Sequence, residues 1–174
     1  DKPLTATLQD GVDVVKAVRA SGLVLGVDHE CRWEPAVRGM RRMLDEGALG
    51  RVLMVESNIS SSTGVRIKPG EWRWSGDECP GGPLLQIGLH HVDLMQYLLG
   101  PIVRVHGWQK HQVINAPIDD TTVTLLEFET GILGYLGSGY ASARSAWIRV
   151  YGDAAIGVYD RYAGLSVSGT PLSG

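Results

Sequence analysis

This 174-residue sequence has few cysteines, only a small excess of charge of one sign, and no long apolar run. Its 16 basic and 19 acidic residues leave a net charge of −3, which excludes the basic field that a nucleic-acid partner needs. No apolar run approaches the ~20 residues that span a bilayer, so we expect no membrane span. Cys31 and Cys79 are the only cysteines and form no C-x-x-C pair. A disulfide between them stays open, but so few thiols favour a reducing compartment, and we expect the cytoplasm.

Glycine, by contrast, is abundant: 23 of the 174 residues, or about 13%, against a usual ~7%. No G-x-y repeat accompanies it, which excludes a collagen-like chain. The length is that of one domain with a core of its own. The sequence opens at Asp1-Lys2-Pro3 without an initiator methionine or a signal-like segment, so we expect it to begin inside a longer protein.

The first 50 residues alternate between helical and strand patterns. Apolar residues at helical spacing predict a helix over residues 10–21, with Asp10 as its cap and Gly22 as its stop. The apolar run 23–27 predicts a short buried strand, and residues 34–46 predict a second helix. Helix, strand and helix in this order are typical of a parallel α/β layer.

From residue 52 onward strand patterns dominate. After a strand at 52–59 and a long irregular segment, the periodicity predicts one helix over 84–99. Six further strands are expected, at residues 102–108, 121–129, 132–140, 146–151, 155–159 and 163–168. We therefore predict an α+β fold: the end of an α/β layer, then a large open, mostly antiparallel sheet with helices on one face. The other face is expected to carry many small residues and to be free for a dimer interface.

Helix 84–99 carries the residues with catalytic potential. Gln86 and His90 are four residues apart and share a face, with Asp93 one step further along it. A neutral histidine is the usual general base near pH 7, although a histidine hydrogen-bonded in the core explains the pattern equally well. A metal site on His90, His91 and Asp93 is disfavoured, because His91 points about 100° away from His90.

Lys2 and Gly88 each allow two interpretations. Pro3 biases Lys2 away from a helical conformation and presents its ammonium from a bend, but a solvated surface lysine fits the same pattern. Gly88 costs about 1 kcal/mol relative to alanine inside a helix. Either a ligand or another segment that packs closely on this side of the helix, near His90, would explain it.

Five segments together resemble the Gfo/Idh/MocA family of NAD(P)-dependent oxidoreductases. Asp1-Lys2-Pro3 resembles its E-K-P motif, and residues 26–35 resemble its V-G-x-x-x-R-x-x-P segment. Residues 81–93 are similar to the signature G-G-x-L-x-D-x-G-x-H-x-x-D, residues 47–50 to a G-x-L-G turn, and residues 148–152 to a late strand that ends in glycine. The five segments occur in the family's order and cover nearly the whole chain.

The resemblance implies a two-domain enzyme of which this chain is the second half. Residues 1–28 would be the last part of the dinucleotide-binding Rossmann domain. Residues 29–174 would form the substrate-binding and oligomerisation domain, similar to the C-terminal domains of dihydrodipicolinate reductase and glyceraldehyde-phosphate dehydrogenase and incomplete at its C-terminus. The G-x-G-x-x-G fingerprint does not occur in the sequence, so NAD or NADP would be bound mainly by residues upstream of Asp1.

The resemblance also assigns roles to residues. Lys2 and His90 would be catalytic, and no residue would bind a metal. The substrate would contact Trp72, Arg73, Gln86 and Asp93, and the cofactor would contact Asp1, Lys2 and Arg73. Gln86 stands where the family's inositol-dehydrogenase-like members carry aspartate. Since an amide hydrogen-bonds without charge, this favours another sugar-like substrate, such as a sugar acid or a nucleotide sugar.

The prediction for the longer protein is an oxidoreductase that transfers hydride between NAD(P) and a secondary alcohol of a sugar-like substrate. Its partners would be that small molecule and further copies of itself, as a homodimer or tetramer through the open sheet face. This chain alone would be inactive. The alternatives are a non-catalytic ligand-binding or dimerisation module on the same scaffold, and an NAD-dependent glycosidase.

Overall fold

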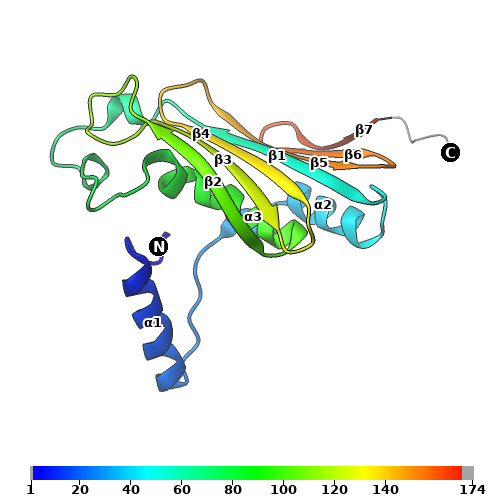
Figure 1. Ribbon diagram of the computed structural model, residues 1–174, viewed down its shortest axis with the longest axis horizontal. Helices are drawn as coiled ribbons and strands as arrows, with labels where there is room; N and C mark the ends of the chain where they lie inside the picture. The colour runs from blue at the N-terminus through cyan, green and yellow to red at the C-terminus, as the bar shows by residue number, and fades with distance from the viewer. Residues whose placement is uncertain (1, 170–174) are drawn as a thin grey trace.

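The computed structural model describes residues 2–169, and its centre is one seven-stranded sheet (Figure 1). In their order across the sheet, the strands are β2 (Ile102–Lys110), β3 (Thr121–Phe128), β4 (Leu133–Gly139), β1 (Val52–Ser60), β5 (Ser145–Gly152), β6 (Ile156–Asp160) and β7 (Gly164–Ser168). Strands β1 and β4 run parallel, and all other neighbours are antiparallel. The predicted open, mostly antiparallel sheet is confirmed.

Two helices, α2 (Pro35–Asp45) and α3 (Leu89–Leu99), cover one face of this sheet, and the described residues place no helix over the other (Figure 1). Met40 of α2 and Leu94 of α3 are fully buried in the same core cluster as the strand residues. The single helix predicted over 84–99 is in two pieces, because a π-helical turn, Leu84–Gly88, precedes α3. Within residues 2–169 no helix is long and apolar enough to cross a membrane.

Small residues lie on both faces of the sheet: Gly157 is on the helix-covered face, and Gly137, beside Asn58, is on the predicted open face. A Cβ atom on Gly157 would lie 2.7 Å from the sulfur of Met40, so glycine there lets α2 pack closely. The open face also carries large side chains. Met54 and Leu133 are paired neighbours there, 43% and 60% exposed, and Leu125 is 48% exposed.

The N-terminal segment departs from the expected α/β layer. Helix α1 (Leu8–Ser21) begins two residues early, because Thr7 rather than Asp10 is its cap, and it ends at Gly22 as predicted. The strand predicted over 23–27 does not form. Leu23 and Val24 are 73% and 97% exposed, since the described part of the chain brings no strand beside them. Figure 1 shows α1 apart from the sheet, joined to it by this extended segment.

Asp120 orders the loop between β2 and β3. Its side chain is fully buried, and its Oδ2 accepts hydrogen bonds from the backbone N–H groups of Gln112, Val113 and Ile114 at 3.0, 2.6 and 3.1 Å. Its backbone oxygen also accepts the N–H of Tyr140 at 2.8 Å. Burial by itself would raise the pKa of Asp120, but the three N–H donors outweigh it and lower the pKa.

We expect Asp120→Asn to lower the free energy of unfolding by about 1–3 kcal/mol at pH 7, because a neutral amide is the weaker acceptor for three donors. The pKa of Asp120 is lower in the folded than in the unfolded protein. The carboxylate therefore stabilises the fold fully at pH values above its ordinary pKa of ~3.9, and this contribution is lost as the pH falls through the folded-state pKa. Urea denaturation from pH 7 to 3 should therefore show the two proteins converging in acid. A gap that stays constant, or an equal loss in the exposed control Asp77→Asn, would contradict this.

Candidate functional site

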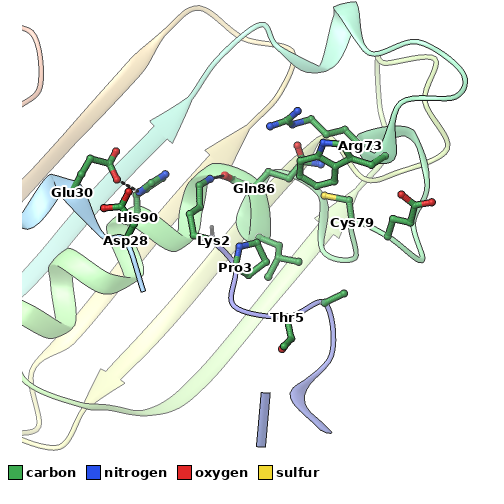
Figure 2. Close-up of a pocket in the computed structure, with 13 residues that line it drawn as sticks. Lys2, Pro3, Thr5, Asp28, Glu30, Arg73, Cys79, Gln86 and His90 are labelled. Atoms are coloured by element: carbon green, nitrogen blue, oxygen red, sulfur yellow. Dashed lines mark hydrogen bonds and ion pairs between the residues drawn. The ribbon is translucent and has the colours of Figure 1, made fainter. Parts of the chain in front are cut away.

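The main cavity lies where the N-terminal segment meets the π-helical turn and the start of α3 (Figure 2). It has a volume of about 690 Å³. Four separate segments of the sequence form its wall. They contribute Lys2, Pro3, Thr5 and Ala6; Asp28 and Glu30; Trp72, Arg73, Glu78 and Cys79; and Leu85, Gln86 and His90. Five of the residues singled out from the sequence are therefore brought together: Lys2, Trp72, Arg73, Gln86 and His90. Asp1 lies outside the described residues.

Gln86 is the centre of the hydrogen bonds at this cavity. It lies in the π-helical turn and is 4% exposed. Its backbone oxygen accepts a hydrogen bond from Lys2 Nζ, and its side-chain Oε1 accepts one from the hydroxyl of the buried Tyr140. Its Nε2 has no hydrogen-bond partner among the described residues. The Gln86 side chain therefore keeps only buried N–H donors unpaired, in the wall of the cavity.

Lys2 reaches the cavity from the N-terminal segment and His90 reaches it from α3. Both side chains have lowered pKa values. Burial lowers the pKa of Lys2, and the charge of Arg73 lowers it further, whereas Glu30 acts against them. Burial, and then the charge of Lys2, lower the pKa of the His90 imidazole. His90 is therefore neutral near pH 7 and can accept a proton.

The Nδ1 atom of His90 faces two residues of the 3-10 turn Glu30–Trp33. It lies 3.9 Å from Glu30 Oε2 and 3.9 Å from the sulfur of Cys31. Burial raises the pKa of the Cys31 thiol to about 12, and the charge of Glu30 adds to this. Both cysteines are free thiols. Nothing in the sequence pattern placed Glu30 and Cys31 beside His90, because the contact joins residues 59 and 60 positions apart.

Asp93 and His91, two further polar residues of α3, do not line the cavity. Both oxygens of the Asp93 carboxylate bind the guanidinium of Arg32, with Arg32 Nε 2.7 Å from Oδ2, and Asp93 does not line the cavity. This geometry gives no support to the predicted contact between Asp93 and substrate. His91 is buried, with Nδ1 2.6 Å from the hydroxyl of Ser57, and burial lowers its pKa to about 3. It is therefore a neutral histidine of the core.

Arg73 lies on the side of the cavity opposite His90 (Figure 2), and Trp72 also lines the cavity. The guanidinium of Arg73 lies over the Trp72 ring at 4.2 Å from its centroid, a stacking that holds the charge in place. Gly88 also has an explanation. A Cβ atom there would lie 3.3 Å from the Ser138 hydroxyl of β4, so the close neighbour is the sheet and not a ligand.

Comparisons with known proteins agree with this fold. A family model described as the GFO/IDH/MocA C-terminal domain matches residues 37–156. 1,5-Anhydro-D-fructose reductase of Ensifer adhaerens is 26% identical over 82% of this chain and 43% of its own length, and D-apiose dehydrogenase of Paraburkholderia graminis is 26% identical over 83% and 37%. A solved structure of levoglucosan dehydrogenase with NADH and L-sorbose superposes with a TM-score of 0.88 at 22% identity, over 99% of this chain and 50% of that one. The chain thus spans half or less of the length of these proteins.

The bond between Tyr140 and Gln86 can be tested by its contribution to stability. Tyr140→Phe leaves the buried Oε1 of Gln86 without a donor, so we expect the free energy of unfolding to fall by about 1–3 kcal/mol in urea denaturation. In a Gln86→Met background the same substitution should cost less, because no acceptor remains to be left unpaired. Tyr162→Phe, at an exposed tyrosine, is the matched control and should be neutral. Equal costs of Tyr140→Phe in both backgrounds would show that the bond contributes nothing.

Proposed function

This chain belongs to the GFO/IDH/MocA family, and on that premise we propose that the protein containing it transfers hydride between NAD or NADP and a secondary alcohol of a sugar-like substrate. The observation that carries the proposal is the meeting of Lys2, Gln86 and His90 at one cavity. In this proposal residues 1–28 complete a dinucleotide-binding domain and residues 29–174 form the substrate-binding and oligomerisation domain. The free thiols of Cys31 and Cys79 favour the cytoplasm.

The cavity residues can divide the chemistry of alcohol oxidation between them. Neutral His90 accepts the hydroxyl proton of the substrate, and the Lys2 ammonium stabilises the negative charge that develops on that oxygen. A nicotinamide cofactor, when bound, supplies the acceptor for the hydride that leaves the same carbon. The cavity fits such a group, because Lys2 and Arg73 bring positive charge to its wall and Gln86 Nε2 is an unused donor among the described residues. Lys2 and Arg73 are the residues that would contact it.

Gln86 sets the kind of substrate atom that fits beside it. Since its Oε1 is engaged by Tyr140 and its buried Nε2 is unpaired, a substrate group that reaches the Gln86 side chain has to accept a hydrogen bond rather than donate one. An ether oxygen, a carbonyl or a carboxylate meets this requirement. The relative named as a 1,5-anhydro-D-fructose reductase takes a substrate with such an ether, and Arg73 could bind a carboxylate at the rim.

The test uses the full-length protein with a panel of sugars, anhydro sugars and sugar acids, and follows the absorbance of reduced nicotinamide. We expect His90→Gln to lower kcat by about 100- to 10,000-fold while cofactor affinity is retained, because proton transfer is lost and binding is not. His106→Gln on β2 is exposed and should leave turnover intact. The 174-residue chain alone should be inactive. Full turnover by His90→Gln, or tight sugar binding without turnover by the wild-type protein, would contradict the assignment.

We propose further that a second copy of the chain covers the open face of the sheet. Met54, Leu125 and Leu133 expose large apolar side chains there, beside the ion pairs Glu56–Arg149 and Arg104–Glu127, and exposed apolar side chains on a sheet face without a covering layer favour association. Strand β1 is the middle strand of the seven, with three strands on each side, so one copy can present the same strands to the other.

Leu125→Asp should convert the dimer to a monomer, because it places a charge in the apolar contact. The matched control is Val167→Asp, a residue of similar exposure whose paired neighbour Gly157 lies on the helix-covered face. Sedimentation velocity measures the outcome. If both variants keep the wild-type sedimentation coefficient, the open face is not the interface.

A further inference from the structure

We propose that Glu30, Cys31 and His90 form a binding site for one divalent transition-metal ion, with Zn²⁺ the best match, in the wall of the main cavity. The three residues come from two rigid elements. Glu30 and Cys31 are consecutive in the 3-10 turn Glu30–Trp33, and His90 is in the first turn of α3. Their potential ligand atoms all lie within 4.8 Å of one another. Nothing in the reaction proposed above uses Glu30 or Cys31.

The separations of the three donors are close to those of a coordination shell. Bond lengths of ~2.3 Å to sulfur and ~2.0–2.2 Å to nitrogen or oxygen, at tetrahedral angles, put donor atoms about 3.3–3.6 Å apart. The structure has Cys31 Sγ 3.5 Å from Glu30 Oε1, and His90 Nδ1 3.9 Å from both Cys31 Sγ and Glu30 Oε2. Because the two contacts use different oxygens of Glu30, and one ligand atom per residue gives separations of up to 4.8 Å, completing the triangle takes a rotation and a small shift of the Glu30 carboxylate. Glu30, with a half-exposed side chain, can supply them.

The donor types select the ion. A thiolate, an imidazole and a carboxylate together favour Zn²⁺ over Mg²⁺ or Ca²⁺, which prefer oxygen ligands alone. Cys31 is 3% exposed and fixes one ligand in the core, whereas Glu30 and His90 line the cavity. A fourth coordination position would therefore face the cavity and stay open to a water molecule or a substrate atom.

The charges around the site limit its affinity. The positive charges of Lys2 and Arg161 both lower the pKa of His90, and the same charges would repel a metal ion bound beside it. The carboxylate of Glu30 and the thiolate of Cys31 supply the two negative charges that balance Zn²⁺. With three protein ligands and two nearby cations, we expect weaker binding than at a structural zinc site with four protein ligands.

Occupation of this site would inhibit the enzyme, a consequence that rests on the proposed function. An ion on Nδ1 of His90 fixes the tautomer that carries its proton on the other nitrogen, so the ring no longer has a free lone pair to accept the substrate proton. The binding site itself does not depend on the proposed function. The two parts of the inference therefore need separate experiments.

Metal binding is tested on the 174-residue chain by titration with Co²⁺, whose spectrum reports its ligands. We expect tetrahedral ligand-field bands and a thiolate-to-Co²⁺ charge-transfer band, both abolished by Zn²⁺. Cys31→Ser should remove the charge-transfer band, and Glu30→Gln, a substitution at an exposed residue, should weaken binding at least 10-fold. Cys79→Ser is the matched control, since Cys79 is the other buried free thiol, and should keep the band. No band in the wild-type chain, or an unchanged band in Cys31→Ser, would overturn the site.

Inhibition is tested on the full-length protein at saturating cofactor and substrate. Zn²⁺ should lower turnover, EDTA should restore it, and Cys31→Ser should need at least 10-fold more Zn²⁺ for the same inhibition. If Co²⁺ binds as expected and Zn²⁺ leaves turnover unchanged, the inhibitory role is overturned while the site stands. A wild-type protein without any turnover refutes the proposed function and leaves the spectroscopic result untouched.

Discussion

The site depends on the position of one side chain, Gln86, which is held at both of its oxygen atoms. Its backbone oxygen binds the Lys2 ammonium and its side-chain oxygen binds the Tyr140 hydroxyl. These bonds join the N-terminal segment, the π-helical turn before α3, and the residue that follows strand β4. Tyr140 in turn follows β4, and its N–H is bound by Asp120, which also orders the loop after β2. The geometry of the cavity is therefore set by a chain of hydrogen bonds that begins in the sheet.

Close packing of helix against sheet makes this chain of bonds feasible. Glycine at position 157 lets α2 approach the strands, and Gly88 allows the π-helical turn to lie beside Ser138 of β4. A π-helical turn widens the helix at the point where Gln86 and His90 must both reach the cavity. Beyond the cavity the same sheet leaves large apolar side chains exposed on its other face, where we propose that a second copy binds.

Local patterns in the sequence sufficed for most of the fold. The alternation of apolar residues predicted all seven strands, of which the five inner ones have one face in the core, and helical periodicity predicted α2 and α3. The strand over 23–27 was wrong because an apolar run says nothing about whether a neighbouring strand is available to pair with it. The small residues turn out to lie on both faces, because composition alone cannot show which side a helix approaches.

The candidate site was predictable only where residues share a helix or a family motif. Lys2, Trp72, Arg73, Gln86 and His90 all reach one cavity. Asp93 does not, because its carboxylate is bound by Arg32, a partner 61 residues away. Glu30 and Cys31 could not be foreseen as neighbours of His90, since a tertiary contact between a 3-10 turn and a helix leaves no periodic signal in the sequence.

The central claim is that the N-terminal segment is anchored at Gln86, so that the Lys2 ammonium lies half-buried in the cavity. The titration of the Lys2 side chain, followed by the ¹³C chemical shift of its Cε in the 174-residue chain, tests this most directly. Burial and the charge of Arg73 predict a pKa below the ordinary ~10.4. An ordinary pKa, unchanged in Arg73→Gln, would mean that Lys2 is free in solvent and that the site does not form.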